Sequence, residues 1–149
     1  MMDDLRELYQ ETILDHNKNP RNFRKMAGGA RHAEGTNPLC GDKVNVYLAL
    51  DGDTVADVSF EGAGCAISTA SASVMTEILK GKPRAEVERL FASFHGMLTG
   101  GATPDLDKIG KLAVFARVSD FPMRVKCATL AWHTMQAALK GDRSSVSTE

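Results

Sequence analysis

The hydrophobic and polar positions alternate most regularly in the middle of the chain, where they predict a two-stranded hairpin. In the first strand every second residue is apolar, at Val44, Val46, Leu48 and Leu50. A returning strand places Ala56, Val58 and Phe60 on one face and Asp57, Ser59 and Glu61 on the other. This period of two is typical of half-buried strands. Between the strands, Asp51-Gly52 favours a type I′ turn, whose two central residues both have positive φ.

Five other segments carry apolar residues at spacings of three and four, the period of an amphipathic helix. The predicted helices span about residues 5–16, 68–80, 83–94, 109–116 and 127–140. Asn19-Pro20, Gly81 and Phe121-Pro122 are the expected breaks. No period survives in residues 21–37, which we expect to be an irregular connection, and residues 95–104 read as a glycine-rich loop. Residues 1–140 are expected to form one domain, followed by a polar, disordered tail at 141–149.

Composition narrows the class of protein. The chain has 149 residues, 43% hydrophobic and 25% charged, with a formal net charge of −1, which is ordinary for one globular domain. The charges are interspersed, so we expect no nucleic-acid partner. No apolar run is long enough to span a bilayer, and the acidic N-terminus is unlike a signal peptide. We therefore expect a cytoplasmic location with reduced thiols and no membrane partner.

The three cysteines are the candidate chemistry. Cys40 lies in a turn, Asn37-Pro38-Leu39-Cys40-Gly41-Asp42, and Cys65 lies in a second glycine-rich turn. Cys40 precedes the first hairpin strand and Cys65 follows the second, so the hairpin brings them together. With Asp42 and Cys127, at the expected start of the last helix, they give three thiolates and a carboxylate, enough for a tetrahedral zinc site. The alternative for each cysteine alone is a small buried hydrophobic residue.

Other motifs are weaker. His32-Ala33-Glu34 matches the H-x-E of zinc deaminases, but the P-C-x-x-C partner is missing. His16, His95 and His133 favour structural roles, whereas His32 is a candidate to approach the cysteines. Ser71 and Ser73 have no His/Asp arrangement around them and read as helix surface or close packing positions.

Four motifs together resemble the IscU/NifU-like iron–sulfur assembly family over about residues 5–140. They are Leu8-Tyr9 through Ile13-Leu14-Asp15-His16 with Asn19-Pro20-Arg21-Asn22, the Cys40 turn, Gly62-Ala63-Gly64-Cys65-Ala66-Ile67-Ser68 with Ala70-Ser71-Ala72-Ser73, and Arg124-Val125-Lys126-Cys127-Ala128-Thr129-Leu130 with Trp132. The resemblance implies an α+β fold, with a small antiparallel sheet, made of a hairpin and a short third strand, packed against helices on one face. It also implies a metal site at one end.

Two features are similar to the SufU-type branch of that family. Lys126 stands where the housekeeping scaffold has a histidine before its third cysteine, and residues 94–111 resemble an extra stretch typical of that branch. SufU-type proteins bind zinc through the equivalents of Cys40, Asp42, Cys65 and Cys127. They accept persulfide sulfur from a SufS-type cysteine desulfurase.

The leading hypothesis is therefore a zinc-dependent sulfur acceptor and shuttle for iron–sulfur cluster biogenesis, a sulfurtransferase-like role. Cys40 is the expected nucleophile because glycine and proline flank its loop, and Arg124 and Lys126 are expected to guide an acidic partner surface. One alternative is a non-enzymatic scaffold that assembles a [2Fe–2S] cluster on the same ligands for other assembly proteins or apo-protein recipients. Another is a zinc-stabilised interaction module.

Overall fold

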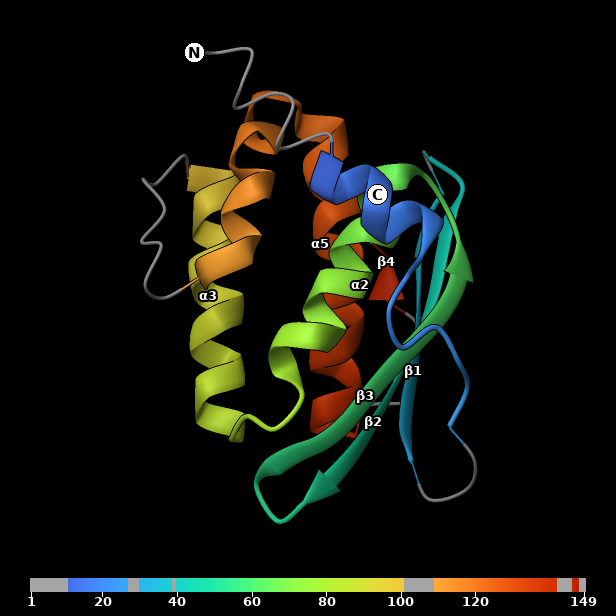
Figure 1. Cartoon of the computed structure of the whole chain (residues 1–149), viewed down its shortest axis with the longest axis vertical. Coiled ribbons are helices and arrows are strands. Elements are labelled where there is room, and N and C mark those ends of the chain that lie inside the picture. The colour runs from blue at the N-terminus through green and yellow to red at the C-terminus, as the bar shows by residue number, and fades with distance from the viewer. Residues whose placement is uncertain (1–10, 27–29, 39, 101–108, 142–145, 148–149) are drawn as a thin grey trace.

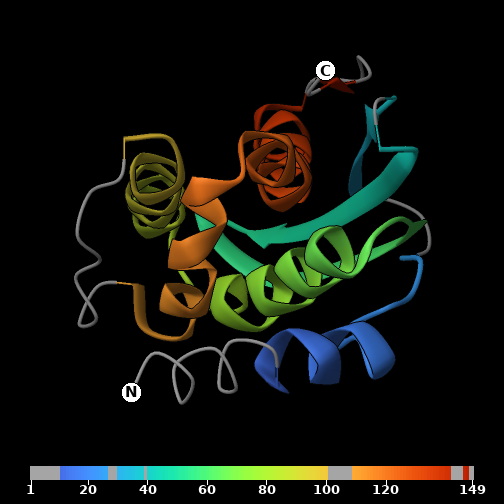
Figure 2. The same cartoon turned by 90° about the horizontal axis from the view of Figure 1, so that it is seen from above.

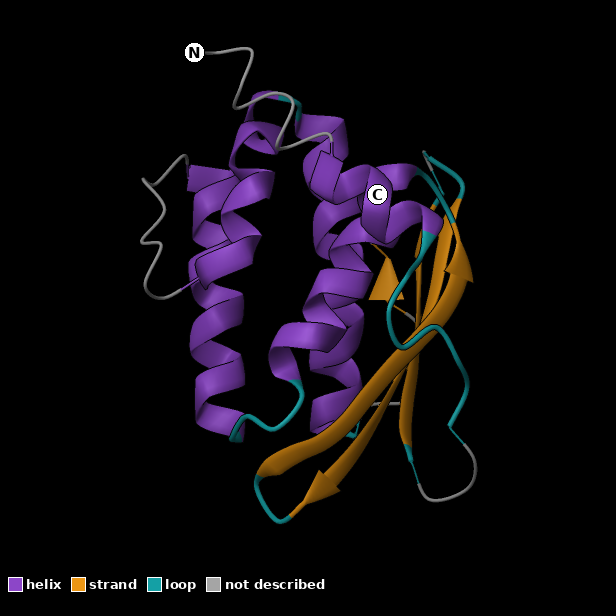
Figure 3. Ribbon diagram, viewed as in Figure 1, coloured by secondary structure: helices purple, strands orange, loops and turns teal. Residues whose placement is uncertain are grey.

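A four-stranded sheet is covered on one face by helices (Figures 1 and 3). The computed structural model describes residues 11–26, 30–38, 40–100, 109–141 and 146–147. The strands are β1 (Arg31–Asn37), β2 (Asp42–Asp51), β3 (Thr54–Ala63) and β4 (Val146–Ser147). Their order is β3-β2-β1-β4, with β1, β2 and β3 antiparallel and β4 parallel to β1. The predicted α+β class, with a hairpin and a further strand, is confirmed.

The helices form two layers on the same side of the sheet. They are α2 (Ala66–Leu79), α3 (Arg84–Gly100), the 3-10 helix η1 (Gly110–Asp120) and α5 (Pro122–Lys140). Helices α2 and α5 lie against the sheet, whereas α3 and η1 lie on the side away from it (Figure 2). Residues 11–18 are also helical and lie beside α2, while the rest of the predicted N-terminal helix falls on residues not described.

Strand β1 corrects the expectation that residues 21–37 are irregular throughout. Its core-facing positions are Ala33, Gly35 and Asn37, which are small or polar, so the segment shows no hydrophobic alternation. The small side chains are required because α5 packs closely: a Cβ on Gly35 would lie 2.0 Å from Thr134 Oγ1. The strand is thus specified by its helix neighbour rather than by its own apolar residues.

The hairpin between β2 and β3 forms as predicted, but its turn differs. Asp51 pairs with Thr54, so the central residues are Gly52 and Asp53 rather than Asp51 and Gly52. Only Gly52 has positive φ (61°), which excludes the predicted type I′ turn. Farther along, the register shifts, and Ala56 is exposed instead of lying on the face of Val58. An extra residue at a β-bulge causes such a change of face.

The helix boundaries also differ from the prediction. Helix α3 continues to Gly100 through the expected glycine-rich loop, because Met97 and Leu98 are buried in the core. The rest of that loop, residues 101–108, lies outside the described part. The helix predicted at residues 109–116 is the 3-10 helix η1, whose buried residues Leu112, Phe115 and Val118 follow a spacing of three.

The last helix, α5, starts at Pro122 instead of near Cys127. Proline suits the first helical position, where no N–H donor is needed. In the layer between α3 and α5, Phe94 packs against Trp132 with ring centroids 4.9 Å apart. No helix in the described residues is long and apolar enough to cross a membrane.

Part of the C-terminal tail is ordered. Val146 and Ser147 pair with Gly35 and Thr36 of β1, where the sequence predicts disorder. Residues 142–145 and 148–149 are among those not described, so their disorder stays a prediction, as does the boundary at residue 140.

Candidate metal and thiol site

The turn between β1 and β2 presents Cys40. Asn37 and Asp42 are the last paired residues of the two strands, and the Cys40 N–H donates to the Asn37 carbonyl at 3.3 Å. Gly41 closes the turn with φ of 72°, a conformation that glycine adopts without steric cost. Cys40 is half-buried and belongs to neither strand. It therefore lies in a hairpin turn of its own rather than at the end of an irregular segment.

Asp42 is the carboxylate at the centre of the site. It is buried, with 2% of its surface exposed, and its Oδ1 accepts the N–H of Cys65 at 2.9 Å. Gly64 makes this approach possible, because a Cβ there would lie 2.6 Å from Asp42 Oδ1. A carboxylate held through one oxygen retains the other as a ligand, and buried charges are normally paired or bound to metal.

Cys65 is brought to Asp42 by the hairpin, as expected. Lys43 pairs with Ala63, so Cys65, the N-cap of α2, follows β3 close to the start of β2. Its Sγ lies 3.9 Å from Asp42 Oδ2.

Cys127 reaches the same place from α5, in the second turn of the helix rather than at its start. It is fully buried, and its Sγ lies 3.3 Å from the Sγ of Cys40. Asn37, itself fully buried, donates from Nδ2 to the Cys127 Sγ at 3.8 Å. The sequence alone assigns Asn37 no role. Its position three residues before Cys40, ahead of a proline, is the only sequence signal for one.

Three of the four predicted ligands form a compact donor set. The ligand atoms lie within 4.8 Å of one another, with one atom each from Cys40, Asp42 and Cys127. The Cys65 sulfur lies next to Asp42 but is not within 4.8 Å of the ligand atoms of all three residues. Two thiols and a carboxylate are a donor set that zinc accepts, and Cys65 would supply a fourth ligand. The donor set therefore fits a zinc ion.

The electrostatics of the site also favour a cation. Burial raises the pKa of the Cys127 thiol far above its usual range, and hydrogen bonds with Asp42 and Cys40 raise it further. Electrostatic interaction with the thiol groups of Cys65 and then Cys127 raises the pKa of Arg124, whose exposed guanidinium faces them. A buried thiol whose neighbours disfavour its anionic form is a group that a bound dication would stabilise as a thiolate ligand.

The histidines lie elsewhere. His32 does not approach the cysteines: it stacks on Tyr47 on the outer face of the sheet, with Nε2 2.8 Å from Asn45 Oδ1. His16 is fully buried, with Nδ1 2.7 Å from Ser73 Oγ. Burial, and then the charges of Lys111 and Arg21, lower its pKa. Ser73 is thus a close packing position.

The other two histidines belong to the interface between α3 and α5. His95 lies inside α3 rather than at its predicted end, and its ring centroid is 5.5 Å from that of His133. Both belong to a cluster around Phe91. Their contacts support the structural roles that the sequence suggests.

The chain is an α+β domain with thiols and a carboxylate gathered at one end of its sheet. This combination places it in the class of small proteins that carry a metal or sulfur site built from cysteines. Residues 8–128 match the NifU-like N terminal domain family. The chain therefore belongs to this family, which acts in iron–sulfur cluster assembly.

Two relatives and one solved structure illustrate the likeness. The zinc-dependent sulfurtransferase SufU of Bacillus subtilis (strain 168) is 41% identical over 87% of this chain and 87% of its own. The iron–sulfur cluster assembly scaffold protein IscU of Streptococcus pyogenes serotype M1 is 37% identical over 91% and 85%. A structure of a proposed scaffold protein for the SUF system from Fervidobacterium islandicum AW-1 is 38% identical, with a TM-score of 0.83 over 89% of this chain and 98% of that chain.

Proposed function

We propose that this protein is a zinc-dependent sulfur acceptor in iron–sulfur cluster biogenesis, with Cys40 as the acceptor. The observation that carries the proposal is the meeting of Cys40, Asp42 and Cys127 within 4.8 Å, from a turn, a strand and a helix. The likeness to a zinc-dependent sulfurtransferase supports the same role. Cys65 completes the proposed ligand set, and a bound zinc ion would keep the thiols deprotonated.

Cys40 suits the acceptor role better than the other two cysteines. Cys127 is fully buried, and the backbone of Cys65 is fixed by its hydrogen bond to Asp42. Cys40 is half-buried on a short turn, where a small backbone movement presents the sulfur to a partner. A nucleophile that must meet a second protein needs this access.

The proposed transfer is a thiol–persulfide exchange with a cysteine desulfurase of the SufS type. The Cys40 thiolate attacks the outer sulfur of the enzyme persulfide, so a sulfur–sulfur bond to Cys40 forms as the bond within the persulfide breaks. The desulfurase cysteine leaves as a thiolate with the electron pair of the broken bond. The transferred sulfur keeps its proton, and no external oxidant or reductant is required.

The surface beside the thiols suits such a docking step. Phe121 and Met123, at the start of α5, are 59% and 56% exposed although both are large and apolar. Arg124 adds a positive charge next to the sulfurs, where it would steer an acidic surface of the desulfurase. We place the desulfurase contact on this face.

The deciding experiment is a single turnover with a SufS-type desulfurase and cysteine, followed by mass spectrometry of the cysteine-containing peptides. We expect one added sulfur on Cys40. The protein should also raise the turnover rate of the desulfurase by accepting its sulfur, and Cys40→Ser should abolish this increase because a hydroxyl is a poor nucleophile near neutral pH. Asp42→Ala keeps the Cys40 thiol but should lose metal. An added sulfur on Cys65 or Cys127, with Cys40 unmodified, would overturn the assignment.

A second candidate is a scaffold that holds a [2Fe–2S] cluster with the same four side chains. The likeness to an iron–sulfur cluster assembly scaffold over 91% of this chain favours it. Thiolate sites accept zinc and iron–sulfur clusters alike. Metal analysis with a visible spectrum of the freshly isolated protein separates the two: tightly bound, colourless zinc supports the acceptor, whereas a brown cluster supports the scaffold.

A further inference from the structure

Two arginines meet at the C-terminal end of α5. Arg31 is the first residue of β1 and Arg84 the first residue of α3. The Nη1 of Arg31 donates to the Leu139 carbonyl at 2.6 Å, and the Nη2 of Arg84 donates to the same oxygen at 2.8 Å. Two guanidinium cations from distant segments are therefore held side by side on one main-chain atom.

These two arginines differ from the other described arginines in their partners. Four of the others form ion pairs with Asp or Glu: Arg21, Arg24, Arg89 and Arg117. A fifth, Arg124, faces thiols. Arg31 and Arg84 form no ion pair with a carboxylate in the described part of the chain. Among the arginines of the described ranges, the two that lie together are thus also the two that pair with no described carboxylate.

Helix capping alone does not account for the pair. Gly141, with φ of 77°, already ends α5, and its N–H bonds to the carbonyls of the last turn. A helix C-terminus carries only about half a negative charge, which does not balance two full cations bound to the same carbonyl oxygen. Each guanidinium has five N–H donors, and the hydrogen bond to Leu139 occupies one of them.

We propose that Arg31 and Arg84 form a binding site for an oxyanion, either a phosphate or a carboxylate. The planar guanidinium fork matches the oxygen spacing of both groups and binds them through paired hydrogen bonds. An anion between the two forks would remove the like-charge repulsion and use the remaining donors. Arg31 is exposed and Arg84 half-buried, so a ligand reaches the site from solvent.

The oxyanion site is separate from the thiols. Arg31 and Asn37 are the two ends of β1, and the Cys40 turn follows Asn37 (Figure 1). Binding at Arg31 and Arg84 therefore does not depend on the proposed sulfur chemistry, and either proposal can fail without the other.

The test is an NMR titration of the full-length, isotopically labelled protein, observed at the arginine Nε–H signals and the Gly141 amide. Inorganic phosphate and a tetraglutamate peptide are the two probes, with sodium chloride at matched ionic strength as the reference. We expect saturable shifts of Arg31 and Arg84 in the millimolar range or below. Saturation by phosphate alone identifies a small anion as the ligand, and saturation by the peptide identifies a protein carboxylate.

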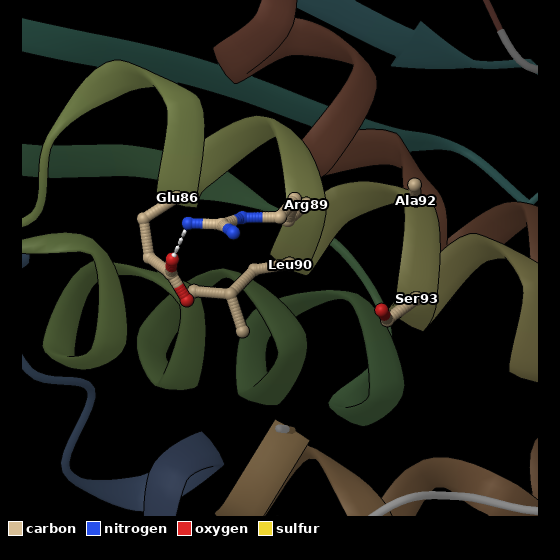
Figure 4. Close-up of a pocket in the computed structure, with 5 residues that line it drawn as sticks. All are labelled: Glu86, Arg89, Leu90, Ala92 and Ser93. Carbon is tan, nitrogen blue, oxygen red and sulfur yellow. Dashed lines mark hydrogen bonds and ion pairs between the residues drawn. The ribbon is translucent and has the colours of Figure 1, made fainter.

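Matched variants separate a site from general salt effects. Arg84→Gln should weaken binding at least about tenfold, because it removes one of two charged forks. Arg89→Gln should leave binding unchanged, because Arg89 already pairs with Glu86 beside a hollow on α3 (Figure 4). Arg84→Lys, which keeps the charge, serves if the glutamine variant does not fold. The proposal would be overturned if sodium chloride at matched ionic strength caused the same shifts of the arginine signals as the probes. It would also be overturned if the shifts caused by the probes persisted unchanged in either Arg84 variant.

Discussion

Replacing Gly64 by alanine should weaken zinc binding without changing any of the proposed ligands. A Cβ at this position would lie 2.6 Å from Asp42 Oδ1, 3.1 Å from its Cγ and 3.2 Å from its Cβ. Asp42 is only 2% exposed, so its carboxylate has little room to retreat. Displacing it breaks the hydrogen bond from the Cys65 N–H, a bond to a charged group that contributes about 1.5–3 kcal/mol.

The expected loss of zinc affinity follows from that energy. At about 1.4 kcal/mol per factor of ten, a loss of about 1.5–3 kcal/mol corresponds to about 10–100-fold weaker binding. This equals the usual effect of removing a group that supports a metal ligand, also about 10–100-fold. Competition with a chromophoric chelator measures the zinc dissociation constant directly, and the melting temperature of the zinc-loaded protein gives an independent readout.

The control is a glycine-to-alanine substitution at a position where the added Cβ has free space. A Cβ on Gly96, in α3, meets no atom within 4 Å. Gly96→Ala should bind zinc like the original chain and gain about 0.5–1 kcal/mol of stability, since glycine weakens a helix interior. If Gly64→Ala bound zinc as tightly as Gly96→Ala, the carboxylate of Asp42 would not be the held ligand that its contacts suggest.

Three further outcomes are expected. Burial, and then the charge of His95, lower the pKa of His133 from its usual value of 6.5. The unfolded chain therefore binds more protons than the folded chain, and the free energy of unfolding, measured in urea, should fall as the pH drops below about 6.5. A smaller fall in His133→Gln is expected, and equal falls would refute the assignment. Gly35→Ala should cost about 1–3 kcal/mol by overpacking against Thr134, and an unchanged urea midpoint would contradict the close contact. Chelation of the metal, or Cys65→Ala, should lower the melting temperature, because metal binding contributes to folding free energy; equal melting of chelated and loaded protein would make the site peripheral.

The sequence by itself determined the elements whose signal is local. The alternation around Val46 and Val58 and the glycine of the turn specify the hairpin, because a strand period and a turn signal are read from neighbours along the chain. The hairpin in turn brings Cys65 beside Asp42, so part of the site is predictable from pairing alone. The short motifs around the three cysteines carry the family resemblance, and the family is confirmed.

Only the tertiary structure decided the features that depend on contacts between distant segments. Strand β1 has no apolar alternation because α5 fills the space above Gly35. Helix α3 continues past Phe94, despite the glycine that follows, because its next residues are buried in the core. The same holds for the site: the depth of Cys127 and the amide of Asn37 against its sulfur depend on how α5 lies against the sheet. Side-chain patterns encode the period of an element, but the distance between two elements is set by the packing of both.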